Sequence, residues 1–232
     1  CGTNGKGSIT MPLDLYLDTA DVAEWDSLMP IGMFKGITTN PLLAHRANLS
    51  YPQINWVDMA QRAADLGALE LHAQVFGSPE TYRPWAEELM TAGQKASIRT
   101  VVKVPLVEPA IRQVPKLTSD GCPILMTACY DAKQMFVATG LGADYIAPYF
   151  GRMLEADLPA YEMIRQMLAI GSGSGTRVLV ASLRSTNQMN KLAEIGCDCF
   201  TIAPDIAWAL LEDERAQAAY CDFETVSQAL SE

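Results

Sequence analysis

Histidine is scarce in this chain, and cysteine occurs without the spacing of a metal site. There are two histidines, His45 and His72, in 232 residues. A catalytic triad or a metal centre built on histidine therefore has little material. Six cysteines are present, but no Cys-x-x-Cys occurs, and Cys197 and Cys199 alternate on one face of an expected strand with no histidine near them. We expect reduced thiols in the core and no bound metal ion.

Positive charge is also in short supply. Lys and Arg number 17 against 27 Asp and Glu, which gives a net charge of -10 and a sequence pI of about 4.7. This balance argues against a nucleic acid partner and against binding to anionic membrane surfaces. It leaves room for a phosphorylated substrate, because a few arginines are enough to hold one phosphate.

Long apolar runs are absent, so the sequence predicts no membrane span. Residues 1–10 precede a Met-Pro pair and lack the apolar core of a signal peptide, and we expect a flexible leader or a remnant of cloning there. The cytoplasm is then the expected location. Residues 11–232 remain as one folded domain, with the length of a single α/β barrel.

What the chain has is a regular alternation of strand and helix. Eight expected strands, each followed by a helix, predict a single-domain (β/α)8 TIM barrel with an extra C-terminal helix. The alternative, an open doubly wound sheet, usually has fewer strands and a glycine-rich first turn that is absent here. The expected strands are 13–18, a very short one in 36–41 that a loop at Pro41 stops, 69–76, 98–105, 123–127, 144–147, 177–182 and 197–202. The expected helices begin at 19–21 and continue with 53–66, 79–92, 108–120 (irregular at Pro115), 132–141, 158–170, 186–195, 204–211 and 214–230.

The fourth expected strand carries a lysine in the middle of an apolar run, VVKVP at 101–105. Alternation places Val101, Lys103 and Pro105 on one side of the strand. A buried lysine loses part of the hydration of its ammonium, its pKa falls, and the free amine can attack a carbonyl group. The sequence therefore offers a Schiff-base lysine. The competing interpretation is a lysine whose stem covers apolar surface while its ammonium reaches water.

Polar side chains gather at the ends of the other expected strands, which is where barrel enzymes place their chemistry. Each could instead cap a helix or satisfy backbone groups. Taken together they suit a carbonyl substrate that condenses with Lys103: some would move protons, some would hold substrate hydroxyls, and two arginines with a serine would clamp a phosphate. No metal ion or organic cofactor is needed for this chemistry. The residues are Asp18, Thr38, Asn40, Gln74, Thr127, Tyr149, Arg152, Ser182 and Arg184.

An ordered set of motifs resembles the small-subunit transaldolase and fructose-6-phosphate aldolase family. The motifs are LYLDTAD at 15–21, GITTNP at 36–41, VVKVP at 101–105, TACY at 127–130, ADYIAPYFGR at 143–152 and ASLRS at 181–185. The resemblance implies a class I aldolase barrel without metal or cofactor, acting on sugar phosphates and aldehydes. It implies Lys103 as the Schiff-base residue and Asp18 as an acid and base. Thr38 and Asn40 would contact donor hydroxyls, Gln74 and Thr127 would hold the catalytic water, and a phosphate would bind at Arg152, Ser182 and Arg184.

Two branches of the family differ in this site. Transaldolases typically have glutamate and phenylalanine where this chain has Gln74 and Tyr149, so the chain resembles the aldolase branch. The alternative is a true transaldolase of the pentose phosphate pathway, which moves dihydroxyacetone from fructose 6-phosphate to erythrose 4-phosphate. Leu42 stands where aldolases often have serine, and Phe76 and Gly77 replace more polar residues. These departures bear on the preferred donor.

Relatives form decamers from two pentameric rings, so the resemblance also implies a homo-oligomer. Residues 214–230 are the candidate for the helix that reaches a neighbour, with Trp208, Tyr220 and Phe223 as apolar anchors. Two rival functions stay open at this point. One is a phosphosugar isomerase that uses Asp18 as a base, with Lys103 as an electrostatic partner, and the other is a non-catalytic barrel that binds sugar phosphates.

Overall fold

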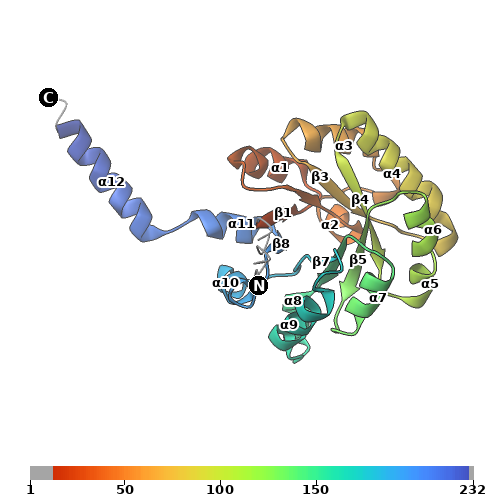
Figure 1. The fold of residues 1–232 in the computed structure, drawn as a ribbon. Helices are drawn as coiled ribbons and strands as arrows, with labels where there is room; N and C mark the ends of the chain where they lie inside the picture. Colours follow the sequence, from red (N-terminus) through yellow and green to blue (C-terminus); the bar gives the residue numbers. More distant parts are fainter. Residues whose placement is uncertain (1–12, 230–232) are drawn as a thin grey trace, which may run out of the picture.

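The computed structural model describes residues 13–229 and confirms the (β/α)8 barrel (Figure 1). Eight parallel strands run in the order β7-β6-β5-β4-β3-β2-β1-β8. An isolated parallel bridge between Val180 and Phe200 closes the ring just beyond the end of β7. The strands are β1 Asp14–Asp18, β2 Gly36–Thr38, β3 Glu70–Gln74, β4 Arg99–Pro105, β5 Ile124–Cys129, β6 Tyr145–Pro148, β7 Arg177–Val178 and β8 Cys199–Ile202. The expected leader at 1–10 lies outside the described residues.

Helices surround this sheet, and short 3-10 turns precede or follow several of them (Figure 1). The α-helices are α1 Val22–Leu28, α2 Pro41–Arg46, α3 Trp56–Asp65, α4 Tyr82–Ala96, α5 Glu108–Ile111, α6 Val114–Ser119, α7 Gln134–Gly140, α8 Phe150–Glu155, α9 Ala160–Gly171, α10 Thr186–Glu194, α11 Pro204–Leu211 and α12 Glu214–Ala229. The 3-10 turns are η1 Met29–Ile31, η2 Tyr51–Gln53 and η3 Pro79–Thr81.

The segment after β2 is a helix and not the loop that the sequence led us to expect. Pro41 opens α2 at its first position, where a missing N–H costs nothing. Asn40 stays extended, as a residue before proline does, and its side-chain oxygen accepts hydrogen bonds from the N–H groups of Leu42 and Leu43. The same proline that stops the strand therefore starts a helix.

Three other boundaries differ from expectation. The helix expected at 108–120 is two helices, α5 and α6, and Pro115 lies in the first turn of α6. Helix α8, directly after β6, was not anticipated. Strand β7 has two residues where six were expected, because the chain beyond Val178 keeps only isolated bridges at Val180 and Ala181 before Ser182 turns to a left-handed φ of 63°.

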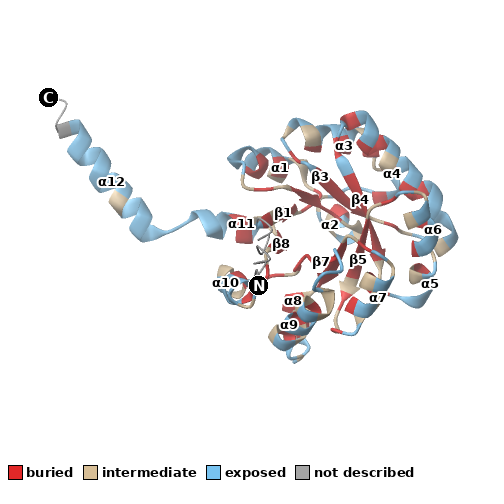
Figure 2. Cartoon of the chain, in the orientation of Figure 1, coloured by how far each residue is buried: buried red, intermediate tan, exposed pale blue. Residues whose placement is uncertain are grey.

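Two separate apolar clusters stabilise the barrel, and Figure 2 shows burial concentrated on the strands and on the inward faces of the helices. The larger cluster fills the layer between sheet and helices, and the smaller one fills the barrel interior. Cys197 belongs to the outer layer and Cys199 to the interior, so the expectation that they share one face is wrong. Cys197 precedes β8, which begins at Cys199, so strand alternation does not extend to it. Both thiols are free and buried.

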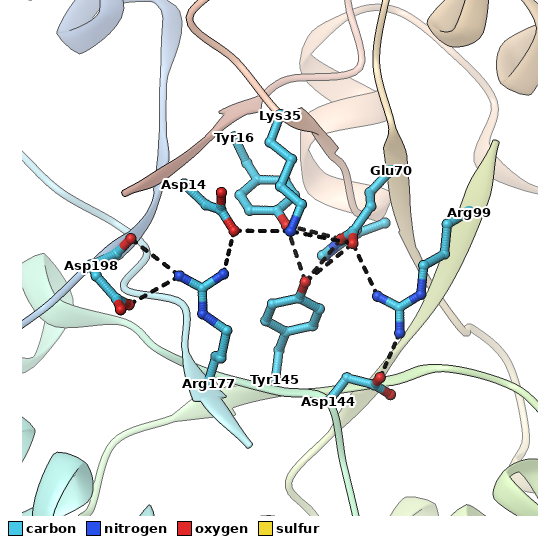
Figure 3. Close-up of polar contacts among 10 residues, drawn as sticks. Asp14, Tyr16, Lys35, Glu70, Arg99, Asp144, Tyr145, Arg177 and Asp198 are labelled. Carbon is cyan, nitrogen blue, oxygen red and sulfur yellow. Dashed lines mark hydrogen bonds and ion pairs between the residues drawn. The ribbon is translucent and has the colours of Figure 1, made fainter. Parts of the chain in front are cut away.

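The amino-terminal end of the barrel is filled by an ionic network (Figure 3). Its centre is Glu70, whose carboxylate accepts hydrogen bonds from Tyr16 at 2.9 Å and Tyr145 at 3.0 Å and pairs with Arg99 at 3.0 Å. Burial alone would raise the pKa of Glu70, but His72 at 2.8 Å and the Tyr16 hydroxyl hold it well below its usual range. The outer members of the network are Asp14, Lys35, Asp144, Arg177 and Asp198.

Helix α12 extends away from the barrel (Figure 1), and its described side chains are almost all exposed. Tyr220, Phe223 and Val226 have exposed fractions of 57%, 68% and 59%. Among the helices of residues 13–229, none is long and apolar enough to cross a membrane.

Candidate active site

A cavity of about 460 Å³ opens at the carboxyl-terminal end of the barrel. That volume suits a small-molecule ligand. All ten residues singled out from the sequence line this one cavity, although they come from seven different strand ends. They are Asp18, Thr38, Asn40, Gln74, Lys103, Thr127, Tyr149, Arg152, Ser182 and Arg184.

Lys103 lies in the interior wall of the cavity on β4. It pairs in register with Gln74 of β3 and Leu125 of β5, and both neighbours also line the cavity. The competing interpretation required an ammonium group that reaches bulk water. Lys103 is only 4% exposed, which does not agree with that interpretation. Burial lowers the pKa of Lys103, and the negative charge of Asp18 opposes this shift. The site therefore contains an amine with an enlarged unprotonated fraction.

Asp18 and Thr38 form a hydrogen-bonded pair at the ends of β1 and β2. The Thr38 hydroxyl donates to the Asp18 carboxylate at 2.6 Å, and it also lies 2.6 Å from the Thr201 hydroxyl of β8. Thr38 is completely buried, so its rotamer is fixed by these partners. The hydrogen bond holds the Asp18 carboxylate in place at the wall of the cavity, which both residues line.

Asn40 and Gln74 present amide groups on neighbouring strand ends. The Asn40 oxygen is used in capping α2, which leaves the NH2 group as its donor toward the cavity. The Tyr51 hydroxyl holds the main chain of Gln74 by donating to its carbonyl at 2.7 Å and accepting from its N–H at 2.8 Å. Tyr51 was not identified from the sequence, because this contact joins η2 to the end of β3 and no local pattern signals it.

The hydroxyls of Thr127 and Tyr149 lie 2.9 Å apart at the ends of β5 and β6. Burial raises the pKa of Tyr149, and the hydrogen bond with Thr127 reduces the shift. A phenol in this state stays protonated and can donate. Ala128, next to Thr127, adopts a left-handed φ of 57°, which is uncommon outside glycine and occurs here at the mouth of the cavity.

A close backbone approach joins α8, which carries Arg152, to the loop that carries Ser182 and Arg184. The N–H of Gly151 donates to the Ser182 carbonyl at 2.9 Å, and a Cβ at Gly151 would lie only 2.1 Å from that oxygen. Arg184 donates to the same carbonyl at 3.2 Å and pairs with Glu155 at 3.0 Å. Arg152 lies over the ring of Tyr149, with its Cζ 5.0 Å from the ring centroid.

The cavity also contains Tyr130 and Arg46, to which the sequence assigned no role. Of the residues that depart from the family pattern, Leu42 lines the cavity, whereas Phe76 packs against Tyr51 outside it. Arg46 lies on α2, a helix that was expected to be a loop, so its direction could not be inferred. Tyr130 follows a strand end within the TACY motif, and that position was a usable signal. Within residues 13–229, no group of three or more His, Cys, Asp or Glu side chains could hold a metal ion.

Comparison with known proteins agrees with this geometry. The family model for Transaldolase/Fructose-6-phosphate aldolase matches residues 15–232. The chain belongs to this family. Among curated members, the "Probable transaldolase" of Phenylobacterium zucineum is 30% identical over 202 residues, covering 86% of this chain and 89% of that protein. The "Probable transaldolase" of Dinoroseobacter shibae is 29% identical over 225 residues, covering 93% and 99%. The chain is therefore an enzyme of the Schiff-base aldolase and transaldolase type.

Solved structures outside the family share the fold alone. A mandelate oxidase variant bound to benzaldehyde aligns with a TM-score of 0.61 at 15% identity, covering 84% of this chain and 66% of that protein. A designed, cube-shaped protein cage aligns with a TM-score of 0.59 at 14% identity, covering 95% and 79%. At this identity the likeness concerns the barrel, and the chemistry rests on the family and the site.

Proposed function

We propose that this enzyme is a class I aldolase that reversibly cleaves a sugar phosphate into a dihydroxyacetone unit and an aldehyde, in the manner of fructose-6-phosphate aldolase. The observation that carries the proposal is the Lys103 amine, 4% exposed, in a cavity whose wall holds a carboxylate, a phenol and two guanidinium groups. The family supports the reaction class, and the site residues support the choice within it.

In the first half of the reaction, Lys103 Nζ attacks the ketone carbon of the substrate. The carbinolamine oxygen takes a proton and leaves as water, which gives an iminium ion. Asp18, Tyr149 and a water held by Gln74 and Thr127 are the groups that move these protons. Thr38 fixes Asp18 for this role through its hydrogen bond of 2.6 Å.

In the second half, the carbon–carbon bond breaks. A base removes the proton of the hydroxyl on C4, the C3–C4 electron pair moves toward the iminium nitrogen, and the aldehyde leaves while an enamine remains on Lys103. Protonation of the enamine at C3 and hydrolysis by water then release dihydroxyacetone and restore the amine. The aldehyde's phosphate binds at Arg152, Ser182 and Arg184, and the donor hydroxyls bind at Thr38 and Asn40.

Gln74 and Tyr149 favour cleavage over transfer. Transaldolases typically have glutamate and phenylalanine at these positions. A phenol that remains protonated, beside a neutral amide, can supply the proton that converts the enamine to a free ketone. The alternative is transfer of the dihydroxyacetone unit to erythrose 4-phosphate, and it predicts rates that rise greatly when that acceptor is added.

Borohydride trapping tests the proposal at the level of one residue. Reduction in the presence of fructose 6-phosphate or dihydroxyacetone is expected to add the three-carbon unit to the peptide that contains Lys103. The matched control is Lys133→Met, which removes a lysine whose side chain is 78% exposed and should keep the adduct. Lys103→Met should lose it.

Each rival function has its own outcome in that experiment. A phosphosugar isomerase would give no adduct, would retain carbonyl binding in Lys103→Met, and would exchange substrate hydrogen with solvent deuterium without cleavage. A binding barrel would give no turnover with any aldehyde. No mass gain on the Lys103 peptide with either donor would contradict the proposal.

We also propose a homo-oligomer, a pentamer or a decamer, in which α12 packs on a neighbouring copy. Its exposed aromatic side chains, with Trp208 of α11 44% exposed, support this because apolar groups of that size are usually covered. Light scattering should give a multiple of five chains, and Phe223→Asp should lower that number. A monomer in both cases would contradict it.

A cytoplasmic location, for which the free cysteines give support, is checked by cell fractionation.

A further inference from the structure

Tyr130 contacts two residues of the proposed site at once. Its ring meets that of Tyr149 edge to face, with centroids 5.7 Å apart. A side-chain interaction with the Tyr130 hydroxyl is also the main cause of the raised pKa of Arg152. Arg152 in turn covers the face of the Tyr149 ring at 5.0 Å. Tyr130 and Arg152 therefore both pack on the Tyr149 ring, and all three side chains line the cavity.

Tyr149 is restrained at three points by this arrangement. Thr127 binds its hydroxyl at 2.9 Å, Arg152 covers one face of its ring, and Tyr130 packs against it. Its backbone is already fixed by the bridge to Ala181 and by its position before α8. Rotation of the side chain is then the motion left to the phenol, and the guanidinium and the second ring limit that rotation.

We infer that Tyr130 is a positioning residue that couples the occupancy of the Arg152 subsite by a dianion to the orientation of the Tyr149 hydroxyl. The inference rests on the proposed function. A phosphate dianion forms short, charge-assisted hydrogen bonds with a guanidinium and fixes its plane. Once Arg152 is fixed, the stacked ring of Tyr149 is fixed with it, and the phenol stays at Thr127, where the enamine is protonated. Binding energy at the remote phosphate is thereby used at the reacting carbon.

This coupling predicts that the dianion can act without being attached to the substrate. The probe is inorganic phosphite, added to the reaction of dihydroxyacetone with unphosphorylated glyceraldehyde. In the wild-type enzyme, phosphite should saturate and raise the maximal rate about tenfold, within the usual range of coupling between two sites. The measured quantity is the ratio of activated to unactivated rate, and it is determined separately for each variant.

Tyr130→Phe removes the hydroxyl that interacts with Arg152 and keeps the ring beside Tyr149. Its activation ratio should fall to about threefold, and that of Tyr130→Leu, which also removes the ring, should fall to about one. The matched control is Tyr161→Phe, because Tyr161 packs on Phe150 at 4.8 Å and does not line the cavity. It should keep the wild-type ratio. Thermal unfolding of each variant checks that the fold is retained.

Three results would overturn the inference. The first is the absence of phosphite activation in the wild-type enzyme while borohydride still labels Lys103. The second is a wild-type ratio in Tyr130→Phe. The third is a change confined to the concentration of phosphite needed, with the maximal ratio intact, since Tyr130 would then serve anion binding alone. If borohydride labels nothing on Lys103, the proposed function itself fails, and the two failures are thus distinguishable.

Discussion

The hydroxyl groups of Thr127 and Tyr149 lie 2.9 Å apart, on adjacent strand ends facing the cavity that contains Lys103. Because burial raises the pKa of Tyr149, the phenol is a donor across the whole neutral range. The hydrogen bond with Thr127, in which either hydroxyl can donate, holds the phenol oxygen in place. The position of one proton thus depends on a single side-chain pair, and its removal should separate cleavage from transfer.

Tyr149→Phe removes that proton and keeps the ring. Cleavage of fructose 6-phosphate should fall roughly 100-fold, which is within the usual effect of losing a general acid. Transfer of the dihydroxyacetone unit to added erythrose 4-phosphate should fall much less, because the enamine then survives until an aldehyde arrives. Steady-state rates with and without the acceptor measure this. Equal losses in both reactions would mean that Tyr149 serves structure and not proton transfer.

Lys103→Met should stabilise the fold while abolishing activity. The folded state holds an amine whose pKa is below its ordinary value of 10.5, so between the folded pKa and pH 10.5 the unfolded chain binds more protons than the folded one. Stability from this group is complete above pH 10.5 and is lost as the pH falls to the folded pKa. Methionine removes this penalty, and we expect a gain of about 1 kcal/mol at pH 7 in urea unfolding. Unchanged or lower stability would contradict a depressed pKa for Lys103 in the folded state.

The pH dependence itself gives a second, independent check on Lys103. The free energy of unfolding of the wild-type enzyme should rise with pH up to 10.5, relative to Lys103→Met measured in the same buffers. The control is Lys133→Met, which removes an exposed lysine and should leave the slope unchanged. A difference between wild type and Lys103→Met that is flat with pH would contradict the depressed pKa.

Glu70→Gln should destabilise the barrel by about 3 kcal/mol, because Lys35, His72 and Arg99 lose a buried carboxylate partner. The matched control is Glu162→Gln, whose exposed pair with Arg165 should be worth less than about 1 kcal/mol. The pKa of Glu70 is depressed, so its stabilisation is complete above the ordinary value of 4.5 and declines as the pH falls further. The acid limb of the stability curve should therefore be shallower in the variant. An equal effect of both substitutions would contradict this.

Gly151→Ala should disturb the candidate phosphate subsite. The new methyl group would lie 2.1 Å from the Ser182 carbonyl and 3.1 Å from Arg184 Cγ, so the backbone of α8 or of the Ser182 loop must move. We expect a loss of about 2 kcal/mol in stability and a rise of about tenfold in KM for the phosphorylated substrate. Gly140→Ala is the control, since nothing lies within 4 Å of its added Cβ, and it should be neutral or slightly stabilising. Wild-type KM in Gly151→Ala would contradict the role of this contact.

The sequence was sufficient for the parts of the site that depend on strand alternation. Lys103 points into the barrel because it shares a side of β4 with Val101, and Val101 belongs to the interior cluster. The strand ends gather because parallel strands in a barrel finish at one rim. These rules need only the spacing of residues, so all ten expected residues line one cavity.

Features that depend on contacts between distant segments could not be predicted. The hold of Tyr51 on Gln74 and the positive φ of Ser182 leave no local pattern. The ionic network at the other end of the barrel was missed for the same reason, since Glu70 and Arg99 become partners only when β3 and β4 pair in register. Helix α2 was missed for a different reason. Pro41 restricts the residue before it and favours a helix after it. The expectation of a loop rests on the first effect alone, and the second effect produces α2.

The network around Glu70 also bears on how ligands reach Lys103. Within residues 13–229, charged and aromatic side chains fill one end of the barrel, and the cavity at Lys103 lies at the other end, where Arg152 and Arg184 line it. Under the proposed function, the aldehyde product has to leave this cavity before another carbonyl compound can bind at Lys103. A molecule bound at the opening of this cavity would therefore block both substrate binding and product release.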